Sequence, residues 1–204
     1  MNIMKKIKSA IKNLMLNVLS NRDLLHEVQS YSESKFFNVN VNKISSILGN
    51  EKIEIFDVGA AGGLEKMSGF SKYKKYCNLT FVEPRNDDSL ELIDDKSLRI
   101  SKLIGLENGN AYLNITENET KSSMLHPSGS FLHYFLNNQQ GFRLKKTLLF
   151  EVTNINTVLN QTGNCIDFLK LDTQGNELDI LIGMGEHRPL FIQTEVSFVP
   201  LYKN

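Results

Sequence analysis

Four acidic residues stand at or near the ends of apolar stretches, where they could take part in binding or catalysis. They are Asp57, Glu83, Asp172 and Glu195. A carboxylate that leaves water is destabilised unless it is hydrogen-bonded or paired with a cation. If these four side chains face one crevice, the partners that suit them are hydroxyl groups, amines or a cationic ligand. The pattern therefore predicts a small-molecule site built from strand ends.

A glycine-rich turn follows the first of these acids. Glycine at Gly59 and at 62–63 allows a tight bend and lets a ligand approach the backbone closely. A dinucleotide-binding turn also needs glycine at the third and sixth positions counted from Gly59, but Ala61 and Leu64 occupy them. Glu83 follows the turn by about twenty residues, where an acid can accept hydrogen bonds from ribose hydroxyls. These features favour an adenosine ligand without a pyrophosphate and disfavour a nicotinamide dehydrogenase.

Short apolar stretches alternate with connections long enough to hold helices, as in a parallel sheet covered on both faces. We predict a doubly wound α/β fold with a mostly parallel, Rossmann-like sheet and N-terminal helices. Ligands of such sheets bind beyond the carboxyl ends of the strands, near the point where the strand order reverses. Strands are expected within 52–63, 78–84, 99–106, 111–116 and 190–198, a strand followed by a turn and a helix within 166–181, and a loop with a short helix over 122–142.

Residues 1–50 are predicted to form a helical segment ahead of a single α/β domain over 51–204. Within 1–20, four lysines accompany apolar residues at helical spacing, and no acid is present. This basic amphipathic helix either packs on its own domain with a solvated lysine face or contacts an anionic membrane surface. The first interpretation is preferred.

The composition fits a globular protein. The chain has 204 residues, of which 41% are hydrophobic and 23% charged, and this is enough to form a full core. Its 23 basic and 23 acidic residues cancel, which argues against nucleic acid as the main partner. Cys77 and Cys165 lie in apolar stretches, no run reaches the roughly 18 apolar residues of a membrane span, and no secretory signal is present. We expect a soluble, cytoplasmic protein without disulfides.

Four motifs, in their order along the chain, resemble those of the FkbM-type family of S-adenosylmethionine-dependent methyltransferases. They are IFDVGAAGG (55–63), FVEP (81–84), IDFLKLDTQGNELDIL (166–181) and TEVSFVPLY (194–202). The resemblance covers about residues 50–204. It implies a class I methyltransferase fold, S-adenosylmethionine as cofactor and methyl transfer to oxygen, often a hydroxyl of a sugar or a secondary metabolite.

The resemblance also implies where the cofactor binds. Its methionine part is expected at the first-strand motif, its ribose at the acid that ends the second strand, and its adenine at 105–108, after the third strand. Asp172 is expected beside the sulfonium and the acceptor. The expected cofactor contacts are Asp57, Gly59, Ala61, Gly63, Glu83, Leu106, Glu107 and Asp172.

Methyl transfer to an alcohol needs in-line positioning and benefits from a base near the hydroxyl. The candidates for that base are Asp172, Glu195, His126 and His133, with Asp172 preferred because the motif sets its place at a strand end. Less specific interpretations stay open. Asp172 could cap the following helix, and each histidine could be a surface or packing residue. Glu177, in the first turn of that helix, is assigned a structural role.

A metal site is the weaker alternative. Asp172 and Glu195 could supply oxygens to magnesium, which some oxygen methyltransferases use. No tight cluster of ligands accompanies them in the sequence, so no metal is predicted.

The resemblance implies a helix and a closing pair of strands after the fifth strand, whereas the sequence ends at VPLYKN (199–204). An apolar strand at the edge of a sheet invites pairing. We therefore expect either a truncated chain or an edge covered by a partner, such as a second copy. Two functions stay open. The first is an O-methyltransferase for a small-molecule or glycan acceptor in cell-surface polysaccharide synthesis, and the second is a non-catalytic cofactor-binding or interaction module.

Overall fold

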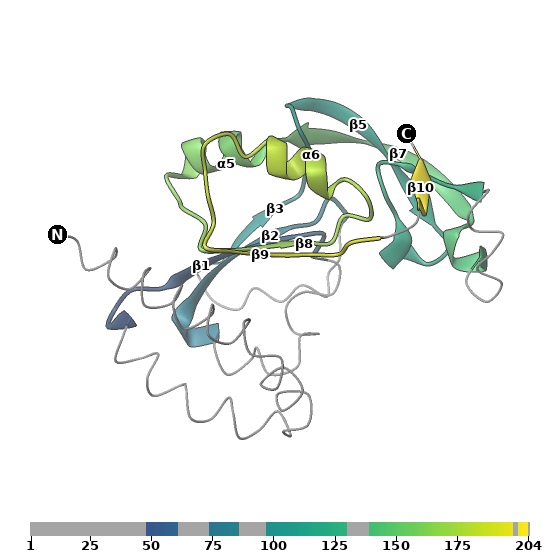
Figure 1. Cartoon of the computed structure of the whole chain (residues 1–204). Coiled ribbons are helices and arrows are strands. Elements are labelled where there is room, and N and C mark those ends of the chain that lie inside the picture. The colour runs from purple at the N-terminus through teal and green to yellow at the C-terminus, as the bar shows by residue number, and fades with distance from the viewer. Residues whose placement is uncertain (1–47, 61–73, 86–96, 130–138, 198–199, 204) are drawn as a thin grey trace, which may run out of the picture. The chain divides into compact units, whose positions relative to one another are not determined.

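The computed structural model describes residues 48–60, 74–85, 97–129, 139–197 and 200–203 (Figure 1). The chain divides into two compact units, residues 1–52 with 67–76 and residues 53–66 with 77–204. The described residues of the first unit include a 3-10 helix, η3 (Lys74–Tyr76). All other elements described below belong to the second unit. The predicted helix over 1–20 lies outside the described residues.

A five-stranded parallel sheet forms the framework of the second unit (Figure 1). Its spatial order is β3-β2-β1-β8-β9, and every neighbouring pair is parallel. The strands are β1 (Ile53–Val58), β2 (Cys77–Val82), β3 (Leu98–Ile100), β8 (Phe168–Leu171) and β9 (Phe191–Thr194). This sheet confirms the prediction of a mostly parallel sheet of the α/β type. The strand order reverses between β1 and β8.

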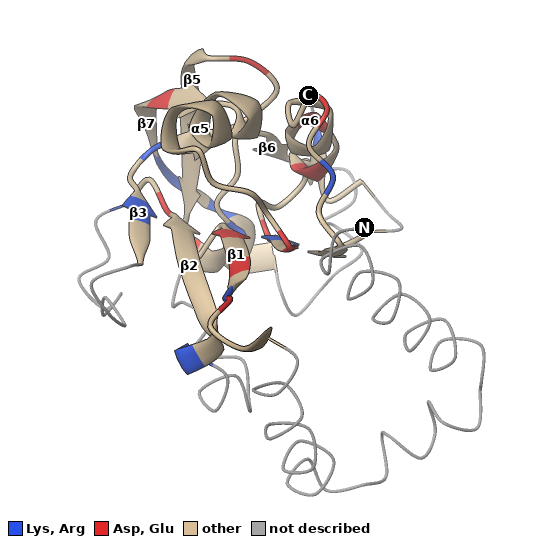
Figure 2. Ribbon diagram, turned by 90° about the vertical axis from the view of Figure 1, so that its left-hand side faces the viewer, with Lys and Arg blue, Asp and Glu red and all other residues tan. Residues whose placement is uncertain are grey.

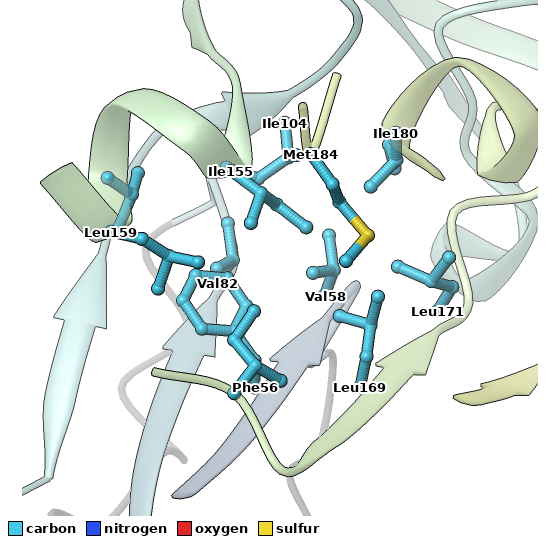
Figure 3. Close-up of a cluster of buried hydrophobic side chains, with 12 residues drawn as sticks. Phe56, Val58, Val82, Ile104, Ile155, Leu159, Leu169, Leu171, Ile180 and Met184 are labelled. Carbon is cyan, nitrogen blue, oxygen red and sulfur yellow. The ribbon is translucent and has the colours of Figure 1, made fainter. Parts of the chain in front are cut away.

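One face of this sheet packs against two helices, α5 (Ile155–Thr162) and α6 (Glu177–Ile182). Ile155, Val158 and Leu159 are spaced to form one buried stripe along α5. Figure 3 shows how Ile155 and Leu159 of α5 and Ile180 of α6 meet side chains from the strands. The strand side chains are Phe56, Val58, Val82, Leu169 and Leu171. Burying a side chain of this size contributes about 1.5–3 kcal/mol, so this layer holds β1 and β8 firmly in place.

Both ends of α5 are capped by residues that suit the position. The Asn154 side-chain oxygen accepts a hydrogen bond from the Thr157 N–H at 2.7 Å, which satisfies one of the exposed donors of the first turn. At the other end, Gly163 adopts a left-handed φ of 69° and its N–H donates to the Leu159 carbonyl. The helix therefore begins and ends at positions that the local sequence dictates.

Asn154→Ala is expected to lower the free energy of unfolding by about 1 kcal/mol, because it removes this N-cap hydrogen bond. Urea denaturation would measure the change. Asn160→Ala is the matched control, since Asn160 lies on the exposed face of the same helix, and its effect should stay within about 0.5 kcal/mol. Equal losses for the two variants would contradict the capping role.

A second, three-stranded sheet has the order β4-β7-β5. Its strands are β4 (Leu103–Ile104), β5 (Gly109–Thr116) and β7 (Leu144–Thr153). The predicted strand over 111–116 is confirmed within β5, which pairs antiparallel with β7. Leu103, Leu113, Ile115 and Val152 form a small core on one side of this sheet.

The prediction of one continuous third strand over 99–106 is wrong. β3 ends at Ile100 and β4 begins at Leu103, and the two strands lie in different sheets. The strand is divided because β4 pairs with the end of β7, a strand that lies much further along the chain. Lys102, between the two strands, forms an ion pair with Glu151 of β7.

Shorter elements complete the described part of the chain. β6 (His126–Pro127) pairs antiparallel with β10 (Tyr202–Lys203). Two further 3-10 helices are η4 (Glu119–Lys121) and η5 (Gln139–Phe142). The segment 122–142 was predicted to contain a loop and a short helix, and η5 occupies its end, while 130–138 lies outside the described residues.

Three general properties of the described residues bear on the sequence expectations. Acidic and basic residues are interspersed over the elements rather than separated by sign (Figure 2). None of the helices within the described ranges is long and apolar enough to cross a membrane. Cys77 is buried, Cys165 is exposed, and the two are not joined in a disulfide.

Candidate functional site

A cavity of about 260 Å³ lies beyond the carboxyl ends of β1, β2 and β8. It therefore sits at the reversal of strand order between β1 and β8, where open α/β sheets bind their ligands. The residues that line it are Val58, Gly59, Val82, Glu83, Pro84, Arg85, Lys102, Leu103, Ile104, Leu113, Glu119, Thr120, Ser122, Met124, Asp172, Thr173 and Gln174. Two of the four predicted strand-end acids, Glu83 and Asp172, thus face the same space.

The turn after β1 is pressed against the end of β8 at Gly59. This residue has a φ of +80°, and a Cβ atom there would lie 2.0 Å from the backbone oxygen of Asp172. Glycine is the residue that meets both conditions without strain. The Gly59 N–H donates to the Val82 carbonyl at 3.0 Å, and the Asp172 N–H donates to the Val58 carbonyl at 3.0 Å. Three strand ends are thereby joined at the wall of the cavity.

Glu83 follows β2 directly, and the side chain of Arg85 covers its carboxylate. The Arg85 Nε donates to Glu83 Oε1 at 2.8 Å, and the Arg85 Nη2 donates to Oε2 at 2.9 Å. The backbone N–H of Arg85 also donates to Oε1, at 3.0 Å. Only 2% of the Glu83 side chain is exposed. The acid expected at the ribose is thus in the cavity wall, held in a two-point ion pair of the strong, geometrically specific kind.

Asp172 and Glu195 are brought together by one amide group. The Nε2 of Gln174 donates to Asp172 Oδ1 at 2.9 Å and to Glu195 Oε2 at 2.7 Å. The hydroxyl of Tyr202 lies 2.8 Å from Gln174 Oε1 and 2.9 Å from the Lys121 carbonyl oxygen, and can donate to either. Asp172 lines the cavity and Glu195 does not. Gln174 therefore links the ends of β8 and β9 beside the cavity.

The backbone of Gln174 is held in a strained conformation. Its φ of 60° is left-handed, which costs a non-glycine residue about 1–2 kcal/mol. The Ser123 hydroxyl donates to the Gln174 carbonyl at 2.7 Å. On the other side, the Glu177 carboxylate accepts the N–H groups of Thr173 and Gly175, each at 2.9 Å. These bonds confirm a structural role for Glu177 and fix the loop that follows β8.

The alternative that Asp172 caps the following helix does not hold in the structure. The N-cap residue of α6 is Asn176, and its side chain makes no capping bond. Asp172 instead receives a hydrogen bond from the Gln174 side chain. Asp172 is exposed and lines the cavity, so it is accessible to a ligand.

Burial raises the pKa of the Tyr202 phenol, and the negative charges of Glu195, Glu177 and Asp172 raise it further. The phenol therefore stays protonated at neutral pH and remains a hydrogen-bond donor. Its ring packs against Phe142, with the ring centres 5.7 Å apart. Tyr202 thus ties β10 to the loop that carries Asp172.

Asp57 lies on the opposite face of β1 from Phe56 and Val58, because side chains alternate along a strand, and it does not line the cavity. It is fully buried and accepts a hydrogen bond from Lys170 Nζ at 2.7 Å. Its Oδ2 has no hydrogen-bond partner among the described residues. Burial raises the pKa of Asp57, while the adjacent Lys170 ammonium lowers it in part. The predicted contact of Asp57 with the methionine part of a cofactor stays a prediction.

Comparison with known families relates this geometry to a class of proteins. The family model described as Methyltransferase FkbM domain matches residues 57–204. The chain belongs to the FkbM methyltransferase family. A search of curated proteins and a search of solved structures found no match. Glu83, Asp172, Gln174 and Glu195 all lie within the matched part of this FkbM methyltransferase.

The other predicted site residues of the FkbM methyltransferase are placed differently. Leu106 and Glu107, expected at the adenine, are exposed and do not line the cavity, whereas residues 102–104 of the same segment do. His126, on β6, lines a separate hollow together with Asp179. The predicted site residues that lie outside the described ranges are Ala61, Gly63 and His133.

No metal centre is found in the part of the FkbM methyltransferase that the structure describes, where no three His, Cys, Asp or Glu side chains are placed to hold an ion. Asp172 and Glu195, the pair considered for magnesium, both accept hydrogen bonds from Gln174. In the structure, the group that these two carboxylates share is the side-chain amide of Gln174.

Sequence reasoning did not single out two residues that shape this site, Arg85 and Gln174. The sequence offered one indication for Arg85, which is its place two positions after Glu83, the acid predicted to bind the ribose, with Pro84 between them. It offered none for Gln174, since the role of Gln174 depends on Glu195 and Tyr202, which lie 21 and 28 residues further along the chain.

Proposed function

We propose that this FkbM methyltransferase transfers a methyl group from S-adenosylmethionine to a hydroxyl oxygen of a saccharide or a similar metabolite. The observation that carries the proposal is the position of Glu83 and Asp172. They end strands on either side of β1 and line one cavity at the reversal of strand order. Methyl transfer follows from the family, while the cofactor and the oxygen acceptor are the proposed parts.

The lining of the cavity fits an adenosine group. Apolar side chains provide a wall of the kind that holds a flat base, and a few polar groups stand among them. The carboxylate of Glu83 suits two ribose hydroxyls, which donate hydrogen bonds and carry no charge. When bound, S-adenosylmethionine supplies a methyl group activated by a positively charged sulfur. The apolar residues of the wall are Val82, Leu103, Ile104, Leu113 and Met124.

Asp172 is the residue we assign to the acceptor. Its exposed carboxylate would accept the proton of the acceptor hydroxyl, a contribution that typically accelerates a reaction by about 10²–10⁴-fold. Gln174 holds one oxygen of this carboxylate at 2.9 Å and leaves the other to the acceptor. Glu195 acts through the same amide as a positioning residue. His126 lines a different hollow and has no part in the proposed reaction.

The setting of the reaction is also part of the proposal. The family resemblance supports an acceptor hydroxyl on a sugar and a place in cell-surface polysaccharide synthesis. The thiols of Cys77 and Cys165, which are not joined in a disulfide, suit the reducing conditions of a cytoplasm.

Glu83→Ala is expected to weaken the binding of S-adenosylmethionine by about 10- to 100-fold. The variant removes hydrogen bonds to a charged group, which contribute about 1.5–3 kcal/mol. Titration calorimetry would measure the affinity. Glu186→Ala is the matched control, because Glu186 is exposed and outside the cavity, and its affinity should equal that of the unaltered protein.

Thermal unfolding of both variants shows whether they fold, and Glu83→Gln, which keeps the shape of the side chain, replaces the alanine variant if that one unfolds. If the unaltered protein does not bind S-adenosylmethionine, the cofactor proposal is wrong. If Glu83→Ala binds as tightly as the unaltered protein, the cofactor lies elsewhere.

The non-catalytic alternative has one observation in its favour, which is that Arg85 already occupies the carboxylate of Glu83. The protein can be incubated with methyl-labelled S-adenosylmethionine and a panel of sugar nucleotides and short oligosaccharides. Label in the saccharide fraction supports the proposed reaction. Tight cofactor binding without transfer to any member of the panel favours a cofactor-binding module.

A further inference from the structure

The carboxylate of Glu83 is nearly saturated with hydrogen bonds. Its Oε1 accepts from the backbone N–H and from the Nε of Arg85, and its Oε2 accepts from Nη2. A carboxylate has about four acceptor sites, two on each oxygen. Counting the donors among the described residues, one site on Oε2 is left, so a ribose that offers two hydroxyl donors cannot use both on Glu83 while the Arg85 side chain stays in place.

The same guanidinium already contacts a second acid. Its Nη1 donates to the Glu119 backbone carbonyl at 2.8 Å and lies 3.9 Å from the carboxylate oxygen Oε2 of Glu119. The two acids differ in their surroundings, because the Glu119 side chain is 56% exposed and that of Glu83 is 2% exposed. Arg85 therefore bridges a buried carboxylate and an exposed one.

We propose that Arg85 is a displaceable cover on the ribose-binding acid, which holds Glu83 until a ribose diol replaces it and which then pairs with Glu119. This inference rests on the proposed function, since it concerns the same cofactor site. It names Arg85 and Glu119 as determinants of cofactor affinity, although neither needs to contact the reacting atoms.

The exchange is consistent with the electrostatics of the site. A buried carboxylate without a partner is strongly destabilising, and the two-point contact of Arg85 supplies that partner and orients the Glu83 side chain before the ligand arrives. When the side chain leaves, Glu83 keeps the backbone N–H of Arg85 and frees the acceptor sites that the ribose needs. Arg85 itself leaves one carboxylate for another. The apparent affinity is the intrinsic affinity multiplied by the fraction of molecules in which Glu83 is uncovered.

A double-mutant cycle on cofactor affinity tests the exchange. Titration calorimetry with S-adenosylmethionine is carried out on the unaltered protein, Arg85→Met, Glu119→Gln and the double variant. Glu119→Gln should weaken binding by about two- to fivefold, the range expected for an exposed ion pair, because Arg85 loses its second partner. Arg85→Met should bind at least about threefold more tightly, because the cover is gone. In the Arg85→Met background, Glu119→Gln should have no effect.

The controls separate this inference from the proposed function. Glu117→Gln, two positions before Glu119 and outside the cavity, should leave the affinity unchanged. Glu119 is exposed, so its variant will fold. If Arg85→Met unfolds, Arg85→Lys replaces it, because lysine covers Glu83 less firmly without the two-point contact and should still bind the cofactor more tightly than the unaltered protein. The inference is overturned if Glu119→Gln has the same effect with and without Arg85, or if Arg85→Met weakens binding. Absence of binding to the unaltered protein would instead reject the cofactor proposal.

Discussion

Lys170→Met is expected to lower the free energy of unfolding by about 3–5 kcal/mol at neutral pH, the usual cost of removing one partner from a buried ion pair. Lys170 is the residue that donates to the fully buried Asp57, at 2.7 Å. Methionine keeps the length and the packing of the lysine stem, so the loss would come from the charge left on Asp57. Urea denaturation at several pH values would measure it.

The loss should shrink as the pH is lowered. Burial raises the folded-state pKa of Asp57 above its ordinary value of 3.8, and Lys170 opposes that rise. The folded protein therefore binds this proton more tightly than the unfolded chain, and its stability falls as the pH rises from 3.8 through the folded-state pKa of Asp57. In Lys170→Met nothing opposes the effect of burial, so the folded-state pKa of Asp57 should be higher than in the unaltered protein. The fall of stability with rising pH then extends to higher pH. In mild acid Asp57 is protonated, so the charge that lacks a partner is removed.

Lys146→Met is the matched control, because Lys146 is exposed on β7, and its stability should change by less than about 0.5 kcal/mol at every pH. A loss for Lys170→Met that is the same at pH values of about 5 and about 7 would contradict a charge on Asp57 as its cause. Such a result would point to lost packing instead.

Asp172→Asn is expected to lower the rate of methyl transfer by about 10²–10⁴-fold, because an amide cannot take the acceptor proton. Asparagine keeps the size of the side chain and an oxygen that can still accept from Gln174, so the loop should fold as before. The rate would be measured by label transfer to whichever saccharide of the panel accepts it. Cofactor affinity, measured by calorimetry, should change by less than about tenfold.

Asp179→Asn is the control for this variant, since Asp179 lies on α6 and lines the hollow that contains His126. Its transfer rate should match that of the unaltered protein. If Asp172→Asn retains the full rate, Asp172 is not the base. If it loses cofactor binding and rate in equal measure, its role is to hold the cofactor.

Local pattern was enough to predict β1, β2, β8 and β9 and two of the acids that meet in the cavity. Apolar runs that stop at Glu83 and Asp172 lie in parallel strands, and the carboxyl ends of parallel strands share one edge of the sheet. Asp57 belongs to the same kind of motif, but it stands one position before Val58, which lines the cavity. The alternation of side chains along β1 therefore turns Asp57 to the other face, towards Lys170.

The remaining features depend on partners that are distant in the sequence. Gln174 adopts a left-handed conformation that residue preferences disfavour, and tertiary hydrogen bonds such as that of Ser123, 51 residues away, hold it there. The split of the predicted third strand into β3 and β4 depends likewise on β7. The position of Arg85 over Glu83 depends on the direction of a side chain after a turn, which spacing alone does not predict.

The central position of β1 has a consequence for the order in which the protein folds. Glu54 meets Asn78 of β2 after 24 residues, whereas Asp57 meets Lys170 of β8 only after 113 residues. Closing the longer loop costs more chain entropy, so contacts of this kind tend to form late. The half-sheet β3-β2-β1 can assemble while Asp57 still lacks its counter-ion. The arrival of β8 is therefore the step that lets this carboxylate leave water and closes the middle of the sheet.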